Sequence, residues 1–567
     1  METYGNVDIQ ELPLSAPSIR RKVEAFLGSN GLRLEEVDVY LAVLDQDGAM
    51  LAGGGLRADI LCCIAVSEAA RSEGLSVPLI SRLIAAAAGR GYPSVKVFTK
   101  PENRSIFESL GFHLLAAAPK AILLENGRGL ERYCQYLQGH QAHGVVVMNA
   151  NPFTLGHRYL LEQAAAEGSL AVIPVKEERS RFPYQERLAM IRNGCGVGVD
   201  VVEGSDYQIS AATFPSYFIK ELSDVAETQM RLDIDLFGRH IAPALGAVVR
   251  YVGSEPSDAL TARYNALLQE LLPSYGVQVV EIRRSKSAGG RFVSATMVRE
   301  ALDEGCYSQA SALVPASTRP YLLSELAARA LRLELETPLK PGLVGPDGSG
   351  AHKDMDFALM QKGIAAIRPF FPAIALATAP GELRRLGIAA EAAMLEATGG
   401  VNTHRGAIFA LGLALSAAAR VTEVSGTQED MQSLLGKIAQ EIIGNALKDS
   451  ALRSTATSGR DARAMALSGY ETLFCDWLPY YRRVKGQPFA LQQTLLRIVS
   501  TLDDTCVLHR AGAARAAAVK AEALALLEAF SEAGLAACCR RFAAEGISPG
   551  GAADMLALTL FMDSIFN

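Results

Sequence analysis

Residues 144–164 read GVVVMNANPFTLGHRYLLEQA and pass from an apolar run through a turn into a helical pattern. The run Gly144–Met148 predicts a buried strand, and the turn at Asn151 predicts the start of a helix. A helix N-terminus has unpaired N–H groups and the positive end of the helix dipole, so it readily receives a phosphate. Thr154 and His157 lie one helical turn apart and can face one phosphate chain, while Gly156 leaves room for a nucleotide. An ordinary strand-to-helix turn with a capping threonine has the same pattern.

The composition indicates a large, well-packed protein of several domains. At 567 residues the chain exceeds what one hydrophobic core supports, so three or four domains are expected. The net charge of −6 disfavours a general nucleic-acid binder. The nine cysteines include no CxxC pair, and the N-terminus is polar and acidic. We therefore expect no disulfide framework, zinc site, signal peptide or membrane span, and a cytoplasmic location.

Three regions differ in their pattern of apolar residues. Residues 1–140 alternate short apolar runs with a helical stretch, residues 141–318 repeat a strand-then-helix rhythm, and residues 319–567 contain long Ala/Leu helices. We predict an α/β domain, a doubly wound α/β domain with a parallel sheet, and an all-α domain, with 314–319 as the last linker. The predicted strands are Val37–Leu44, Ile60–Val66, Val95–Thr99, Gly144–Met148, Leu170–Val175, Val199–Val202, Ala247–Val252 and Val277–Ile282. The predicted helices include Leu79–Ala88, Ile408–Val421 and Ala513–Ala543.

A second candidate phosphate site lies in RFVSATMVREAL, residues 291–302. Ser294 and Thr296 stand at another expected helix start, and Arg299 follows one turn later. Hydroxyls, exposed amides and a guanidinium can together hold β- and γ-phosphates. A serine N-cap with a surface arginine would look the same. Because one pattern follows the first strand and the other follows the last, the pair favours a nucleotide site.

Together the two patterns resemble the HxGH nucleotidyltransferase superfamily, with Thr154 in place of the first histidine. Within it the chain is similar to the citrate lyase ligase family, which also shares EERSRFPYQERL (177–188), ATFPSYFIK (212–220) and YVGSEP (251–256). The resemblance implies that ATP activates acetate to acetyl-adenylate and pyrophosphate. The acetyl group then passes to the prosthetic-group thiol of the citrate lyase acyl carrier subunit. Such chemistry needs charge stabilisation at the α-phosphate and little covalent help.

The resemblance also implies roles for residues around one ATP molecule, with Mg²⁺ as its companion. Thr154 and His157 act at the α-phosphate. The residues that bind the rest of the nucleotide are Asn151, Gly156, Gly253, Ser254, Glu255, Ser294, Thr296 and Arg299. The run Gly253–Glu255 lies near the adenosine. Ser294, Thr296 and Arg299 hold the outer phosphates.

Residues 62–84, CCIAVSEAARSEGLSVPLISRLI, resemble the acetyltransferase (GNAT) pattern, in which a strand runs through a loop into a helix. Arg71, Gly74 and Ser76 occupy that loop, and FTKPENRSIFESLGF (98–112) resembles the closing strand-helix-strand of the fold. One function is a cradle of backbone N–H groups for the pyrophosphate of a CoA-like arm. The other is a retained scaffold without acetyl transfer.

The helical region carries four polar helix junctions marked by glycine. They are TPLKPGLVGPDGSGAHKDMDF (337–357), GGVNTHRGAIFALGLAL (399–415), TLDDTCVLHRAG (501–512) and ISPGGAADMLALTLF (547–561). Each alone fits a cap or a turn, but clustering around one polyphosphate pocket explains all four. Asp354 and Asp356 can share a Mg²⁺ or divide between metal and water, although one of them can instead serve as a cap.

All four junctions resemble the triphosphoribosyl-dephospho-CoA synthase family. That family joins ATP to 3′-dephospho-CoA, expels adenine and keeps the triphosphate. The resemblance implies cations on the triphosphate and a carboxylate that takes the proton of the attacking ribose hydroxyl. The cation candidates are Lys340, His352, Lys353, His404, Arg405, His509 and Arg510. The candidates for metal ligand or base are Asp354, Asp356, Asp503 and Asp504, in no order of preference. Asp354 and Asp356 are also the candidates for catalytic residues.

Two positions depart from the synthase pattern. Met465 stands where relatives carry an acidic residue, and Gly345 stands where an aspartate is expected after Gly-Leu-Val. The main hypothesis is a bifunctional enzyme that matures and charges citrate lyase. The alternatives are an active ligase whose helical half only binds partners or dimerises, and a generic adenylyltransferase for CoA biosynthesis. A synthase that serves a malonate decarboxylase is a further alternative, which the attached ligase disfavours.

Overall fold

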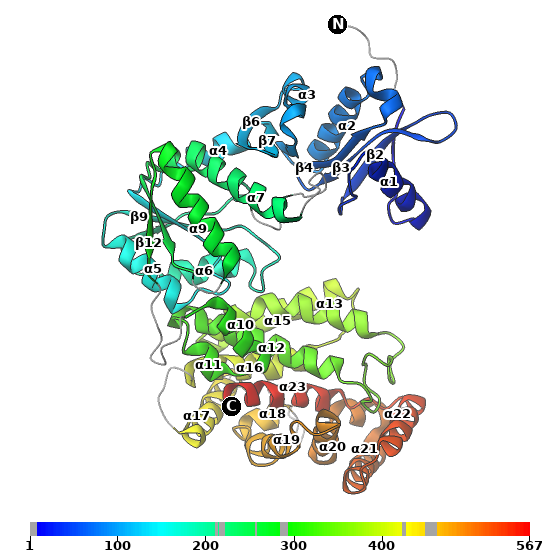
Figure 1. Cartoon of the computed structure of the whole chain (residues 1–567). Coiled ribbons are helices and arrows are strands. Elements are labelled where there is room, and N and C mark those ends of the chain that lie inside the picture. Colours follow the sequence, from blue (N-terminus) through cyan, green and yellow to red (C-terminus); the bar gives the residue numbers. More distant parts are fainter. Residues whose placement is uncertain are drawn as a thin grey trace. The chain divides into compact units, whose positions relative to one another are not determined.

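The computed structural model describes residues 8–209, 214, 222–255, 258–283, 293–421, 427–447 and 462–567. The chain forms two units, Met1–Val293 and Ser294–Asn567 (Figure 1). This division differs from the predicted linker at 314–319, because those residues lie inside the second unit, where Val314 and Thr318 are buried. The helices before them, α10 (Ala295–Glu304) and α11 (Tyr307–Ser311), pack against the helix that follows.

The first unit begins with a seven-stranded mixed sheet in the order β1-β2-β3-β4-β5-β7-β6. Its strands are β1 (Ile9–Glu11), β2 (Val39–Leu44), β3 (Met50–Arg57), β4 (Ile60–Val66), β5 (Val95–Thr99), β6 (His113–Ala118) and β7 (Ala121–Asn126). Its helices are α1 (Pro17–Ser29), α2 (Ser76–Gly89), α3 (Arg104–Ser109) and α4 (Gly129–Leu137). Side chains alternate along β2, so Leu41 joins the core under α2 while Ala42 joins the core that contains α1. The predicted strands at β2, β4 and β5 and the helix at α2 are confirmed.

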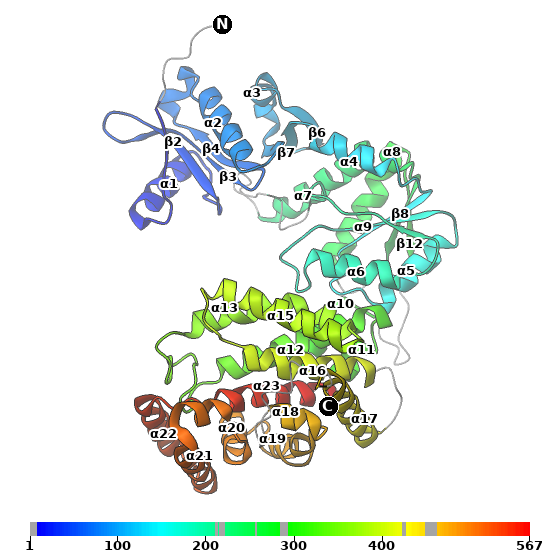
Figure 2. The same ribbon diagram turned by 180° about the vertical axis from the view of Figure 1, so that it is seen from behind.

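A five-stranded sheet follows, and all its strand pairs are parallel, as the sequence predicts. Its order is β10-β9-β8-β11-β12. The strands are β8 (Gly144–Met148), β9 (Leu170–Pro174), β10 (Val199–Val201), β11 (Val249–Gly253) and β12 (Gln278–Ile282). The helices between them are α5 (Leu155–Ala165), α6 (Tyr184–Gly194), α7 (Leu222–Leu236), α8 (Ala242–Leu245) and α9 (Ala259–Leu271). The chain therefore runs outward from β8 in one direction and resumes at β11 on its other side (Figure 2).

The two sheets of the first unit share one hydrophobic core. Leu115 and Leu123 of the first sheet belong to the same buried cluster as Val145 and Ile173 of the second sheet and Leu236 of α7. The carboxylate of Asp235 on α7 also accepts a hydrogen bond of 2.7 Å from the backbone N–H of Ala117 on β6. Residues 1–140 and 141–293 are thus packed together rather than joined by a free linker.

Arg187 on α6 ties together the carboxyl ends of the two central strands. Its guanidinium is fully buried and donates to the backbone carbonyls of Asn149, Val175, Glu177 and Phe182 and to the side-chain oxygen of Asn149, at 2.6–3.0 Å. The first three of these residues follow β8 and β9. A buried guanidinium is stable only when its donors are paired, so Arg187 holds these loops in one arrangement.

The second unit is helical among the residues that are described. Its helices after α11 are α12 (Arg319–Glu336), α13 (Phe357–Ile367), α14 (Phe371–Leu376), α15 (Pro380–Ala397), α16 (Arg405–Val421), α17 (Gln428–Leu447), α18 (Ala462–Leu467), α19 (Leu478–Val484), α20 (Ala490–Thr501), α21 (Thr505–Glu528), α22 (Glu532–Glu545) and α23 (Gly550–Ile565). Helix α23 is the centre of this unit, because it is mostly buried and packs against α12, α16 and α20. The predicted helix Ala513–Ala543 is wrong in one respect: it is two helices, and Ser531 caps the second by accepting from the N–H of Gly534.

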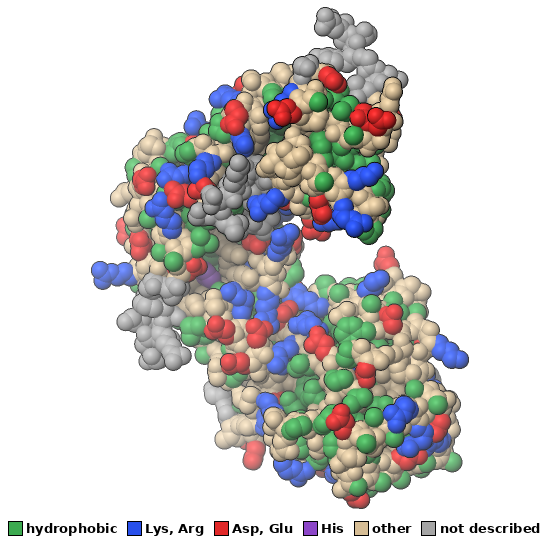
Figure 3. All heavy atoms as spheres, turned by 45° about the vertical axis from the view of Figure 1, so that its right-hand side comes forward, with side chains coloured by type: hydrophobic (Ala, Val, Ile, Leu, Met, Phe, Trp, Pro, Cys, Tyr) green, Lys and Arg blue, Asp and Glu red, His purple; other side chains and the backbone are tan. Residues whose placement is uncertain are grey.

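The surface carries charges of both signs. On the face shown in Figure 3, Lys and Arg side chains lie interspersed with Asp and Glu side chains. In the part of the chain that the structure describes, every helix is too short or too polar to traverse a lipid bilayer.

Replacing Arg187 by methionine keeps the length of the side chain but removes five buried hydrogen bonds. We expect a local loss of about 3 kcal/mol, because four carbonyl groups lose their buried donor. Amide hydrogen exchange of the β8 and β9 peptides in the full chain should then accelerate on the order of 100-fold. The control is Arg158→Ala, which breaks only an exposed pair with Glu162 and should change exchange less than about threefold. Unchanged exchange in the Arg187 variant would contradict the assigned role.

Candidate functional sites

The first candidate site lies where the strand order of the parallel sheet reverses. Strands β8 and β11 are neighbours, yet the connections from them leave in opposite directions. The loops after their carboxyl ends therefore separate and leave a crevice, which is where ligands bind in such sheets. The stretch after Met148 and the run beginning at Gly253 both emerge at this edge, so the structure places these two predicted segments on adjacent strands.

Thr154 and His157 form a reciprocal cap at the start of α5. The Thr154 side chain accepts from the backbone N–H of His157 at 3.3 Å, and the Thr154 backbone N–H donates to His157 Nδ1 at 3.0 Å. Thr154 Oγ1 also lies 2.9 Å from the same ring nitrogen. Thr154 is 1% exposed, whereas His157 keeps partial exposure. Thr154 therefore acts on the ring of His157 rather than on solvent.

This cap determines the tautomer of His157. Because Nδ1 accepts the Thr154 N–H, the neutral imidazole carries its proton on Nε2. The ring is stacked on Phe153, with ring centres 5.8 Å apart and planes 14° apart. The fixed ring thus presents an N–H donor beside the N-terminal amides of α5, a combination suited to an anion.

Two other predicted residues in this stretch contact the protein itself. Asn151 accepts from the backbone N–H of Phe182 at 3.2 Å through its side-chain oxygen. A Cβ atom at Gly156 would stand 2.9 Å from the carbonyl oxygen of Val293. The space that Gly156 leaves is therefore filled by main chain, which differs from the expectation of room for a nucleotide.

The second predicted phosphate pattern, residues 291–302, crosses the boundary between Val293 and Ser294, and its three predicted site residues belong to the second unit. Ser294 caps α10 by accepting from the N–H of Met297 at 3.3 Å, and Arg299 donates to the hydroxyl of Thr296 at 2.9 Å. Its first two residues, 291–292, lie outside the described residues. So do Pro256, the last residue of the third quoted motif, and residues 212–220 except Phe214.

The remaining residues predicted for the first unit lie at the end of β11 and in the loop before α2. Gly253 ends β11, and the backbone N–H of Ser254 donates to the carbonyl of Ile282 at 2.9 Å, ahead of Glu255. In the first sheet, Gly74 has a φ of 66° and ends a short 3-10 helix that contains the exposed Arg71. Helix α2 then starts at Ser76, so the predicted strand-loop-helix arrangement is present.

The second candidate site is a cavity in the helical unit. It encloses about 870 Å³ of space free of protein atoms, its open mouth included. Residues from all four quoted junctions line it. The polar ones are Glu334, His352, Asn402, Thr403, His404, Arg405, Cys506, Arg510, Ser548 and Asp554. The prediction that the four junctions share one pocket is thereby confirmed at the level of geometry.

His352 and Arg510 meet at the wall of this cavity. His352 Nε2 lies 2.8 Å from the hydroxyl of Ser548, and its Nδ1 lies 3.5 Å from the Arg510 guanidinium. Burial, followed by the charge of Arg510, lowers the pKa of His352. These groups join the first, third and fourth junctions and present a cation to the cavity.

Lys340 and Glu334 form a buried ion pair next to His404. Lys340 Nζ contacts the Glu334 carboxylate and donates to its backbone carbonyl at 2.6 Å. Burial, followed by the charge of Lys340, lowers the pKa of His404 to about 4. Nδ1 of this neutral ring lies 2.9 Å from the hydroxyl of Thr403. Lys340 is thus occupied by Glu334, and it does not line the cavity itself.

The other predicted cations are placed differently. Arg405 lines the cavity and is paired with Glu391, with 2.6 Å between Nε and the carboxylate. Lys353 and His509 are exposed and are absent from the lining of the cavity.

The four aspartates predicted as metal ligands do not come together. Asp504 is buried and accepts from the backbone N–H groups of Cys506, Val507 and Ala552. Asp356 caps α13, Asp503 pairs with Lys520, and Asp354 is largely exposed beside His352. No cluster of three or more His, Cys, Asp or Glu side chains suited to a metal is found among the described residues. These side chains therefore do not fit a preformed Mg²⁺ site, and we derive no step through one.

Two acidic residues at the cavity were missed by the sequence analysis. A Cβ atom at Gly406 would lie 1.9 Å from the carboxylate of Asp554, so Asp554 reaches across to the start of α16. Burial, followed by the charges of Glu334 and Asp504, raises the pKa of Asp554 well above its ordinary value. Asp554 lies within a quoted junction but in an apolar helical run, and Glu334 lies outside every junction. Only the packing of α12 against α23 reveals them.

The two departures from the synthase pattern have different surroundings. Met465 is 2% exposed and belongs to the core of the unit. A Cβ atom at Gly345 would lie 3.0 Å from the carboxylate of Asp347, which also accepts from the N–H of Leu339 at 3.0 Å. An acidic group is therefore present beside Gly345, two residues further along the chain.

Comparisons with known proteins divide the chain in two. A family model described as the citrate lyase ligase C-terminal domain matches residues 143–322, and one described as ATP:dephospho-CoA triphosphoribosyl transferase matches residues 320–567. A citrate (pro-3S)-lyase ligase of Klebsiella pneumoniae is 40% identical over 319 residues, which are 54% of this chain and 92% of that protein. The Escherichia coli K12 ligase is 37% identical over 335 residues, 56% of this chain and 94% of the ligase.

The second part of the chain has its own relatives. The 2-(5''-triphosphoribosyl)-3'-dephosphocoenzyme-A synthase of Klebsiella pneumoniae is 37% identical over 270 residues, which are 44% of this chain and 96% of that synthase. A crystal structure of Thermotoga maritima TmcAL with alpha-thio ATP is 14% identical and covers 60% of this chain and 93% of its own. Its TM-score is 0.20, a value that supports no conclusion.

The low pKa of His404, about 4, has a consequence for acid stability. An unfolded chain takes up a proton on this ring as the pH falls below about 6.5, whereas the folded chain does so only near the lower value, so stability falls across this window. We expect about 3 kcal/mol of this loss to disappear in His404→Gln. Hydrogen exchange of the α16 and α23 peptides in the full chain at several pH values measures it. Exposed His509→Gln is the control, and an identical pH profile in the His404 variant and the wild type would contradict the expectation.

Proposed function

We infer that this chain, which belongs to the citrate lyase ligase family in its first part and to the triphosphoribosyl-dephospho-CoA synthase family in its last part, is a bifunctional enzyme that serves citrate lyase. One activity acetylates the prosthetic-group thiol of the acyl carrier subunit with ATP and acetate. The other joins ATP to 3′-dephospho-CoA, releases adenine and yields the precursor of that prosthetic group. The matches over both parts favour this function over a ligase with a degenerate helical half.

The ligase proposal is carried by the fixed ring of His157. Its Nε2–H and the first amides of α5 would stabilise the charge that develops on the α-phosphate as the acetate oxygen attacks and pyrophosphate leaves. Thr154 is a positioning residue, because it fixes the tautomer and orientation of the ring. Ser294, Thr296 and Arg299 are the proposed ligands of the outer phosphates, on the family pattern. Mg²⁺ bound to the phosphates would neutralise part of their charge.

The synthase proposal is carried by the cavity of the helical unit. His352, Arg405 and Arg510 lie on its wall and would hold the triphosphate. The reaction breaks the bond between adenine and C1 of the ribose, and the 2′-hydroxyl of dephospho-CoA forms the new bond at that carbon. Asp554, whose surroundings favour the protonated form, would give its proton to the departing adenine. Glu334, held by Lys340, would accept the proton of the hydroxyl.

The first sheet would dock the CoA-like arm of the acyl carrier. Support comes from the loop at Gly74, which turns the chain directly into the N-terminus of α2 as in a pyrophosphate cradle. A scaffold role without a ligand stays the alternative.

Two single substitutions in the full chain separate the activities. His157→Ala should lower acetate-dependent pyrophosphate release on the order of 100-fold or more and leave adenine release intact. Asp554→Asn should do the reverse, with adenine release falling by a factor of about 100 to 10,000, because the group that protonates adenine is lost. Both products are measured in parallel by chromatography and a coupled pyrophosphate assay.

The wild type supplies the decisive control. A chain that releases pyrophosphate but never adenine, with ATP and dephospho-CoA present, would make the helical half a binding module. Pyrophosphate release that needs phosphopantetheine and no acetate would make the first half a generic adenylyltransferase. Thr154→Ser should keep most ligase activity, because its hydroxyl can still contact His157.

A further inference from the structure

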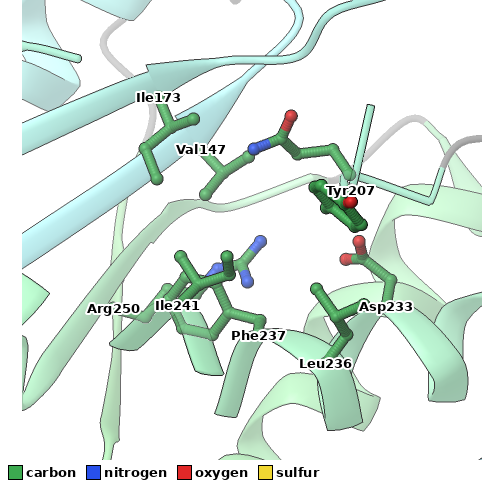
Figure 4. A pocket seen from close by; sticks show the side chains of 9 residues that line it. Val147, Ile173, Tyr207, Asp233, Leu236, Phe237, Ile241 and Arg250 are labelled. Carbon is green, nitrogen blue, oxygen red and sulfur yellow. The ribbon is translucent and has the colours of Figure 1, made fainter. Parts of the chain in front are cut away.

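A second, smaller pocket lies inside the first unit, separate from the loops just described. It is bounded by β8 and β9 on one side and by α7 and the π-helical turn Phe237–Ile241 on the other. Figure 4 shows the Arg250 guanidinium between the strand residues Val147 and Ile173 and the helical residue Phe237. Gly253 faces Leu160 of α5, and residues three apart on a strand point to opposite faces. The pocket is therefore on the face of the sheet away from α5.

Arg250 is buried without a full set of hydrogen-bond acceptors. It is 3% exposed, and its Nη2 donates to the hydroxyl of Tyr264 at 3.0 Å. Its Nε and Nη1 have no acceptor among the described residues. The guanidinium carbon lies 4.3 Å from the ring centre of Phe237, which holds the planar group in place. Two N–H donors of a fixed, buried cation are thus available to a small anion.

Arg187 provides an internal comparison in the same domain. It is equally buried, but each of its three nitrogens donates to an oxygen of the protein. Leaving the donors of a buried charge unpaired is costly, and the fold avoids that cost at Arg187. The different pattern at Arg250 indicates that its remaining acceptors come from a ligand.

Asp233 is an acidic residue that lines this pocket, and both of its oxygens already have partners. Oδ1 accepts from the backbone N–H of Ile209 at 3.0 Å, and Oδ2 accepts from the hydroxyl of Tyr264. Burial raises the pKa of Asp233, and the charge of Arg250 acts against this rise. The Tyr264 hydroxyl accepts from Arg250 Nη2 and donates to Asp233, so it bridges the two groups, while Nε and Nη1 of Arg250 have no acceptor among the described residues.

The pocket suits a very small ligand with an apolar end. The pocket contains about 260 Å³ of space free of protein atoms, the open solvent at its mouth included. Val147, Ile173, Leu236 and Ile241 supply apolar walls for a methyl group.

We propose that this pocket is the acyl-acid site of the chain, where Nε and Nη1 of Arg250 bind the carboxylate of a short monocarboxylate. Naming acetate as that acid rests on the proposed ligase function. Val147 and Ile173 are the penultimate residues of β8 and β9, whereas Arg250 is the second residue of β11, in register with Val145, so its side chain reaches the pocket from the amino-terminal part of the sheet. Burial of the methyl group and a single buried cation together select a short acid over a longer or a doubly charged one.

The test compares Arg250→Met and Arg250→Lys with the wild-type full chain. In acetate-dependent pyrophosphate release, we expect the methionine variant to raise the KM for acetate at least about tenfold and to leave the KM for ATP within about twofold. The KM for acetate of the lysine variant should lie between those of the wild type and the methionine variant, because lysine keeps the positive charge but loses the two-pronged geometry of the guanidinium. A KM for ATP that stays within about twofold shows that the first unit of each variant is folded. The proposal would be overturned if the methionine variant had the same KM for acetate as the wild type, or if its KM values for acetate and for ATP rose by the same factor.

A change in the size of a wall residue should alter the preference between acids of different length, which a purely structural role of the pocket would not do. Ile241→Val removes one methyl group from the wall and should raise kcat/KM for propionate relative to acetate by about tenfold, since one methylene is worth roughly that factor in an apolar pocket. The matched control is Leu188→Val, which removes a similar volume from a buried residue of α6 outside the lining. The proposal fails when both variants shift the ratio equally.

Direct binding distinguishes this proposal from the ligase function on which it rests. Calorimetric titration of the full chain with sodium acetate, without nucleotide, should show saturable binding that Arg250→Met abolishes. If the wild type lacks acetate-dependent pyrophosphate release but still binds acetate in this way, the proposed ligase function is wrong and the proposed acid-binding pocket is retained. If neither wild type nor variant takes up acetate, water alone satisfies Arg250 and the proposed site is overturned.

Discussion

The first half of this molecule depends on one buried guanidinium. Arg187 collects the carbonyls that follow β8 and β9, so the loops at the carboxyl edge of the sheet take one course. Parallel sheets leave these loops without ladder partners, and such backbone groups must be paired elsewhere. Because the same edge begins α5, the position of His157 depends on a hydrogen-bond network from a different helix.

The two candidate sites are built on different length scales. Thr154 and His157 are three residues apart, and their geometry follows from a helix cap that the sequence can encode locally. The cavity of the helical unit is assembled from segments as distant as His352 and Ser548, which meet only because α23 packs at the centre of the unit. A local cap is preorganised by its own turn, whereas the cavity relies on the packing of the whole unit.

Buried charges divide into those that support the structure and those open to a ligand. Lys340 with Glu334, Asp504 with three backbone amides, and Arg187 with its carbonyls are all paired within the protein. Arg250 is not paired in this way, and it borders a pocket. The distinction follows from desolvation, since a buried charge is stable only where its hydrogen bonds are completed by the protein or by a bound molecule.

From the sequence alone, the parallel sheet, its strands and the four junctions of the helical unit could be predicted, because apolar periodicity and turn residues are local signals. The strand β3, with three consecutive glycines, could not, and neither could the break between α21 and α22 within an unbroken alanine-rich pattern. Asp554 and Arg250 also escaped, because a single charge in an apolar run carries no local sign of a pocket, and Glu334 escaped because it lies in a charged helical stretch outside every junction. Only the tertiary structure decides which of them is paired, since their partners lie on other elements of the fold.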